Sequence, residues 1–158
     1  APEITFSVAD GAVKGVNQQI SFTCEASDPL SGVASSTCEE ISVPAYELGL
    51  GSHTFKAEAV DHAGNSSSNS VTVIVTVNYD SLGSLTEQFL PEAGVESNIL
   101  NSLLAKLALA KAAEEKGNKN ARNGQLGAYI NEVEAKSNKE FTEKQVKVLI
   151  QLAETLMK

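Results

Sequence analysis

The spacing of apolar residues changes near residue 79, and this change constrains the fold more than any other feature of the 158-residue chain. Before it, residues 53–60 and 71–77 alternate apolar with polar side chains, the period of a strand with one face in a core. After it, apolar residues recur every three to four positions, as on the buried face of a helix. The sequence therefore predicts two domains, an all-β domain over residues 1–79 and an all-α domain over residues 80–158.

Turn-forming clusters divide the first domain into short strands. Residues 4–8 and 19–24 are further strand-like stretches, and Gly, Pro, Asp and Asn gather between the stretches, at 10–11, 28–32, 49–52 and 62–65. Many short strands at this spacing predict an antiparallel β-sandwich.

Apolar stripes in the second domain predict one short and three longer helices in an up-down bundle. The stripes include Val95, Ile99, Leu103 and Leu107, then Leu126, Tyr129, Ile130 and Val133, then Val146, Leu149, Ile150, Ala153 and Leu156. The helix ends are marked by two capping boxes, a glycine and a proline: Ser84-x-x-Glu87, Thr142-x-x-Gln145, Gly117 and Pro91.

The two cysteines, Cys24 and Cys38, lie on either side of the predicted turn at 28–32. A small β domain gains stability from such a cross-link, about 3 kcal/mol for a loop of this length. We therefore expect a Cys24–Cys38 disulfide and an oxidising compartment. The alternative is a pair of buried free thiols. A zinc site is not expected, because His53 and His62 complete no zinc-binding spacing.

The net charge of −8 argues against nucleic acid as a partner and against anionic membranes. The charge is uneven, since residues 1–79 hold two lysines against nine acidic residues, whereas the helical half is nearly balanced. The apolar runs are much shorter than the ~18 residues of a membrane-spanning helix, so no membrane insertion is expected.

Two family resemblances go beyond these patterns. Residues 3–77 resemble a bacterial immunoglobulin-like module, through the segments 28–33, 50–55 and 59–65, which read DPLSGV, LGSHTF and AVDHAGN. Residues 82–157 resemble the FIMAH domain of secreted bacterial hydrolases, lyases and surface proteins, through the segments 98–107, 116–119, 125–133 and 146–156. The resemblance implies an immunoglobulin-like β-sandwich followed by a small helical bundle, near the C-terminus of a larger secreted protein.

In an immunoglobulin-like sandwich the loops at 28–32 and 61–65 lie at the same end, so Asp28 and Asp61 are expected to converge, with Asn65 and Glu3 nearby. Carboxylate and amide oxygens are the ligands that Ca²⁺ prefers. The sequence thus offers a calcium site as one hypothesis. The other is ordinary turn chemistry, in which Asp and Asn accept hydrogen bonds from their own loops.

A basic stretch in the helical half, Lys111, Lys116, Lys119 and Arg122, is a candidate contact for an anionic ligand. The alternative is a solvated face in which these cations pair with nearby acidic residues.

The sequence contains no nucleophile elbow, phosphate-binding loop or zinc-protease motif, so we expect no enzyme activity and no catalytic residues. We expect a non-catalytic C-terminal accessory region of a secreted bacterial enzyme or surface protein, located outside the cell or on its surface. It would space or stabilise its parent, or attach it to polysaccharide or the cell wall, with the parent's preceding catalytic domain as its neighbour. The alternatives are a protein–protein docking module and a spacer without a ligand.

Overall fold

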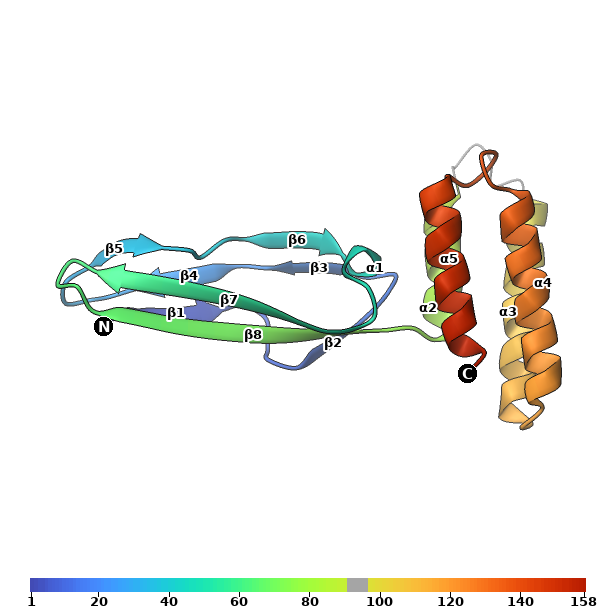
Figure 1. Ribbon diagram of the computed structural model, residues 1–158, viewed down its shortest axis with the longest axis horizontal. Coiled ribbons are helices and arrows are strands. Elements are labelled where there is room, and N and C mark those ends of the chain that lie inside the picture. The colour runs from blue at the N-terminus through green and yellow to red at the C-terminus, as the bar shows by residue number, and fades with distance from the viewer. Residues whose placement is uncertain (91–96) are drawn as a thin grey trace. The chain divides into compact units, whose positions relative to one another are not determined.

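The computed structural model describes residues 1–90 and 97–158, and the chain forms two compact units, Ala1–Thr76 and Val77–Lys158 (Figure 1). A β-rich region is followed by a helical region, as the change in apolar spacing predicts. The expected change of domain at 79–80 falls within the first helix of the second unit, which is capped by Asn78 and starts at Tyr79. We call these parts the β unit and the helical unit.

The β unit contains three small sheets. The largest has the strand order β2-β8-β7-β5, and the other two pair β1 with β4 and β3 with β6. The elements are β1 Glu3–Phe6, β2 Ala12–Gly15, β3 Gln19–Phe22, β4 Cys24–Ser27, β5 Val33–Ser36, β6 Ile41–Pro44, α1 Ala45–Leu48, β7 Gly51–Asp61 and β8 Ser66–Thr76. In Figure 1 the long strands β7 and β8 run side by side as an antiparallel hairpin, while β2 pairs with β8 in parallel.

The sequence pattern identified the long strands and two of the short ones, since the stretches at 4–8 and 19–24 overlap β1 and β3. The predicted stretches at 53–60 and 71–77 lie in β7 and β8, and their buried side chains include Ala57, Val71 and Val73. The sequence did not predict β2, β4, β5 or β6 as strands, because four residues with mostly half-buried or exposed side chains give no clear period. Edge-to-face contacts of Phe22 with Phe6 and Phe55 join the small sheets to β7.

The helical unit contains α2 Tyr79–Phe89, α3 Ser97–Glu115, α4 Lys119–Ala135 and α5 Glu143–Leu156. The capping box Thr142-x-x-Gln145 is confirmed, and Gly117 follows α3 with a positive φ of 75°. The capping box predicted at Ser84-x-x-Glu87 is wrong, because both residues lie inside α2 and a capping box formed by Asn78 and Ser81 starts the helix. Pro91 and Val95 lie outside the described residues.

The predicted apolar stripes form the interior of the helical unit. Leu103, Leu126, Tyr129, Val133 and Leu149 are fully buried. Across the described ranges, 1–90 and 97–158, the structure has no helix with the length and apolar character needed to span a membrane.

Candidate functional site

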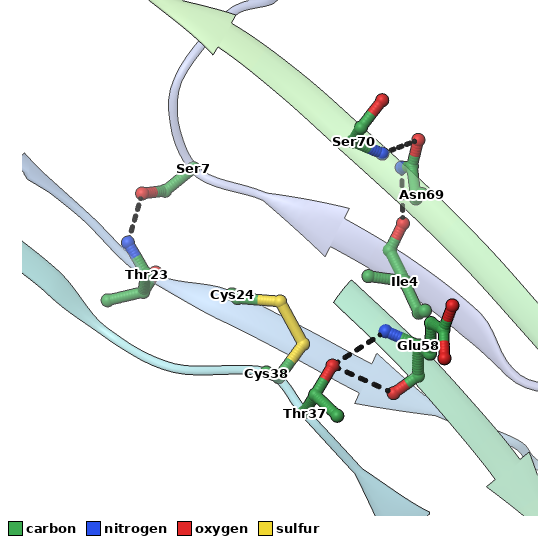
Figure 2. Close-up of a disulfide and its surroundings, with 9 residues drawn as sticks. All are labelled: Ile4, Ser7, Thr23, Cys24, Thr37, Cys38, Glu58, Asn69 and Ser70. Carbon is green, nitrogen blue, oxygen red and sulfur yellow. Dashed lines mark hydrogen bonds between the residues drawn. A yellow bond between two sulfur atoms is a disulfide. The ribbon is translucent and has the colours of Figure 1, made fainter. Parts of the chain in front are cut away.

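A disulfide bond cross-links two segments of the β unit. Cys24 and Cys38 are bonded, with their Cα atoms 5.2 Å apart, and this confirms the predicted pairing. Figure 2 shows that Thr37, next to Cys38, fastens the same segment to β7. Its hydroxyl accepts a hydrogen bond from the Glu58 N–H at 2.8 Å, and its own N–H donates to the Glu58 carbonyl at 2.8 Å. The disulfide indicates an oxidising environment for the folded chain.

The loops at 28–32 and 61–65 meet at one end of the β unit. The His62 N–H donates to the carbonyl of Gly32 at 3.1 Å, which fixes one loop to the other. The side chains of Asp28 and Asp61 are nearly completely buried there, and an Oδ2 atom of each lies 3.7 Å from the amino nitrogen of Ala1.

Both carboxylates accept hydrogen bonds from their own loops. Asp28 Oδ1 accepts the N–H groups of Leu30 and Ser31, at 2.8 and 3.0 Å. Asp61 Oδ1 accepts the N–H groups of Ala63 and Asn65, and its Oδ2 accepts the Asn65 side-chain amide at 3.0 Å. These contacts are the turn chemistry that the sequence offered as the alternative to calcium.

The described residues bring together only part of a calcium donor set. Ca²⁺ takes six to eight oxygen ligands, and here only two carboxylates converge. Asn65 presents an N–H group to Asp61, and Glu3 is exposed, with Ser27 as its partner in the β1–β4 register. In the parts of the chain that the structure describes, no three His, Cys, Asp or Glu side chains are grouped to hold a metal ion. We therefore do not propose calcium binding.

Hydrogen bonding keeps the pKa of Asp61 well below its ordinary value. The side-chain bond from Asn65 is the largest cause, and the loop N–H groups and Ser31 lower the pKa further, while burial opposes them. Because these donors favour the charged form, Asp61 acts as a structural anion.

The predicted basic stretch is divided between the interior and the surface. Arg122 is 3% exposed and donates to Glu114 at 3.1 Å, to the Met157 carbonyl at 2.6 Å and to Asn123 at 3.0 Å. It thereby connects the ends of α3, α4 and α5. Lys111 Nζ lies 3.4 Å from Asp80 Oδ1 and forms an ion pair with it. The other two cations of the predicted stretch, Lys116 and Lys119, are exposed.

A second buried polar contact joins α2 to α4. The Thr86 hydroxyl donates to the carbonyl of Leu82 at 2.8 Å, which leaves its oxygen to accept the Tyr129 hydroxyl at 2.7 Å. Both residues are fully buried. Burial raises the pKa of Tyr129 well above its ordinary value.

A groove of about 630 Å³ runs between α2 and α3 on the outside of the helical unit. Its floor is formed by small and apolar residues, and its rim by charged and polar ones: Tyr79, Asp80, Gly83, Ser84, Glu87, Leu104, Leu107, Ala108, Lys111, Ala112 and Glu115. Sequence reasoning missed this feature. The available signal was the small residues that its lining includes, Gly83 of α2 and Ala108 and Ala112 of α3.

Comparison with known proteins adds no relative. The chain matches no protein-family model, and a search of curated proteins finds no match. Function is therefore argued from the residues and their geometry.

Proposed function

We propose that this chain is a non-catalytic accessory region, on the C-terminal side of a secreted bacterial enzyme or surface protein. The β unit, as an immunoglobulin-like sandwich, spaces and stabilises the parent. The helical unit, as a FIMAH-like bundle, attaches it to polysaccharide or to the cell surface. The parent's preceding catalytic domain is the expected neighbour.

The observation that carries this proposal is the use of the buried polar side chains. Asp61, Arg122 and Tyr129 are the kinds of groups that perform catalysis when they face a cleft. Here each makes hydrogen bonds that stabilise the fold. Asp61 accepts bonds within its own hairpin turn, Arg122 connects three helix ends, and Tyr129 bonds to Thr86. This pattern supports a structural and binding role.

The disulfide supports the secreted setting, because such bonds persist in oxidising compartments. The charge distribution supports the helical unit as the contact. The β unit, with its excess of acidic residues, would repel acidic glycans and cell walls, whereas the helical unit is nearly neutral.

The test is binding of the full chain to a panel of polysaccharides and bacterial cell walls, with release of reducing ends followed in the same samples. We expect saturable binding without turnover. Lys116→Glu with Lys119→Glu should weaken binding to anionic members, and the matched control is Lys144→Glu with Lys147→Glu, which changes two exposed lysines near the start of α5. Turnover by the chain would exclude an accessory role.

A second candidate is a protein–protein docking module. The groove between α2 and α3 favours it, because a concave face with an apolar floor and a polar rim suits a peptide or helix of a partner. Failure to bind any glycan or cell wall would leave docking or pure spacing as the function of the chain.

A further inference from the structure

The outward side of α3 is apolar next to the groove. Ala105, Ala108, Leu109 and Ala112 are all exposed, and Leu109 is 56% exposed. Their spacing of three and four residues places them along one stripe of the helix. The inner face of α3 is separate from this stripe and is buried through Leu103, Leu107 and Ala110. Thus α3 carries one apolar face for its own bundle and a second face that is open to solvent.

The groove and this stripe form one continuous surface, since Ala108 and Ala112 belong to both. On α2, the groove extends from Tyr79 to Glu87, a length of about 12 Å at the rise of an α-helix. Close packing at Gly83 sets its floor: a Cβ atom there would lie 3.1 Å from Leu104 Cδ2. The groove volume is in the range of sites that hold a ligand or a peptide segment.

The rim has an excess of negative charge. Asp80, Glu87 and Glu115 line the groove, and the lysine among its lining residues, Lys111, already pairs with Asp80 at 3.4 Å. The carboxylates of Glu87 and Glu115 are exposed at the two ends of the groove. This distribution is complementary to a cationic ligand.

Tyr79 lines the groove with its ring, while its hydroxyl is buried beneath it. The residue is only 7% exposed. Its buried hydroxyl makes no hydrogen bond of good geometry among the described residues, and the polar groups near it are those of Glu114 and Arg122. Burial raises the pKa of Tyr79, and the nearby Glu114 carboxylate adds to this effect. A buried hydroxyl without a well-formed hydrogen bond costs stability, so Tyr79 contributes to the groove through its ring.

We propose that the α2–α3 groove and the exposed stripe of α3 bind an amphipathic helix of a partner protein, with lysine or arginine residues beside its apolar face. The small side chains of α3 allow a helix backbone to approach closely, Leu109 packs against the partner's apolar side chains, and the rim carboxylates pair with its cations. A second copy of this chain fits less well, because it would bring the same excess of carboxylates to the contact. The inference deepens the docking role and rests on it.

The test uses the full chain and synthetic helical peptides of about 14 residues. The first has an Ala/Leu stripe flanked by lysines, the second has glutamate at every lysine position, and the third keeps the lysines with a scrambled apolar stripe. Titration calorimetry measures affinity, and amide chemical shifts locate the site. We expect saturable binding of the first peptide, shifts confined to α2 and α3, and at least about tenfold weaker binding of the other two.

Substitutions in the chain make the test specific to this site. Glu87→Gln with Glu115→Gln should weaken the lysine peptide about tenfold, whereas Glu134→Gln with Glu154→Gln, exposed on α4 and α5, should not change its affinity. Tyr79→Phe keeps the ring and removes only the buried hydroxyl, so it should leave the thermal stability of the chain unchanged or higher and the peptide affinity unchanged.

Three outcomes would overturn the proposal: no saturable binding of the lysine peptide, equal binding of the glutamate peptide, or an affinity that Glu87→Gln with Glu115→Gln does not change. Concentration-dependent dimerisation with shifts along the α3 stripe would assign the surface to a second copy instead. Loss of glycan or cell-wall binding alone would not bear on the groove, so the two proposals fail separately.

Discussion

The two units are stabilised in different ways. The β unit is acidic, and its long strands β7 and β8 bury small or β-branched side chains such as Ala57, Ala59 and Val73. The disulfide and the turn hydrogen bonds therefore contribute much of its order. The helical unit buries larger side chains such as Leu126, Leu149 and Tyr129, and its buried polar groups bond to one another inside. A small domain thus obtains its stability either from covalent and loop constraints or from a continuous core.

Removing the disulfide should separate the two units most clearly. We expect Cys24→Ser with Cys38→Ser to destabilise the β unit by about 3 kcal/mol, because the unfolded chain regains the freedom of the loop between the cysteines. In a unit of this size that lowers its melting temperature by more than about 10 °C. Differential scanning calorimetry should show the transition of the helical unit unchanged. A shift of both transitions would show that the two units melt together.

Replacing the buried arginine should act on the other unit. Arg122→Met removes charged hydrogen bonds to Glu114 and to the Met157 carbonyl, and we expect a loss of about 2–3 kcal/mol in the helical unit alone. Glu114→Gln is the matched milder change. Glu114 is half exposed, and the amide oxygen of the substituted glutamine can still accept a hydrogen bond from Arg122. Equal losses for the two variants would contradict the structural role of the Met157 contact.

The Thr86–Tyr129 pair should show an asymmetry. Thr86→Val leaves the Tyr129 hydroxyl buried without a partner, which costs about 1–3 kcal/mol. Tyr129→Phe costs less, about 1 kcal/mol, since Thr86 keeps its bond to the Leu82 carbonyl. Urea unfolding followed by circular dichroism measures both. The reverse order would mean that the hydroxyl of Tyr129 has another partner in solution.

The stability of the two units should respond to opposite extremes of pH, and neither response is expected near neutral pH. Asp61 has a lowered pKa in the folded chain, so its contribution to the β unit is full above its unfolded pKa of about 3.8 and is lost as the pH falls further. Tyr129 has a raised pKa, so its contribution to the helical unit is full below about 10.0 and is lost as the pH rises.

Melting curves at low and high pH measure these two responses. Asp61→Asn should flatten the acid response of the β unit, and Tyr129→Phe should flatten the alkaline response of the helical unit. Acid sensitivity that persists in Asp61→Asn would place its origin in other carboxylates.

Local sequence patterns determined the order of elements. The strands at 53–60 and 71–77 and the capping box of Thr142 and Gln145 could be predicted from the sequence. Each depends only on residues within a few positions of one another. The cysteine pairing was also predictable, since the two cysteines flank a short loop. The start of α2 was not, because Ser84-x-x-Glu87 has the usual sequence of a capping box, whereas the observed cap is formed by Asn78 and Ser81.

What the tertiary structure alone decided is which side chains become partners. From the sequence, Arg122 was one of four cations in a basic stretch, and Asp28 and Asp61 were turn residues or, as a second hypothesis, calcium ligands. In the fold, Arg122 is buried where the ends of three helices meet, and both carboxylates accept hydrogen bonds from N–H groups of their own loops. The fold also left a groove between α2 and α3, with Gly83, Ala108 and Ala112 among its lining residues. Period and capping are local properties of the chain, whereas burial and pairing arise only when distant segments pack together.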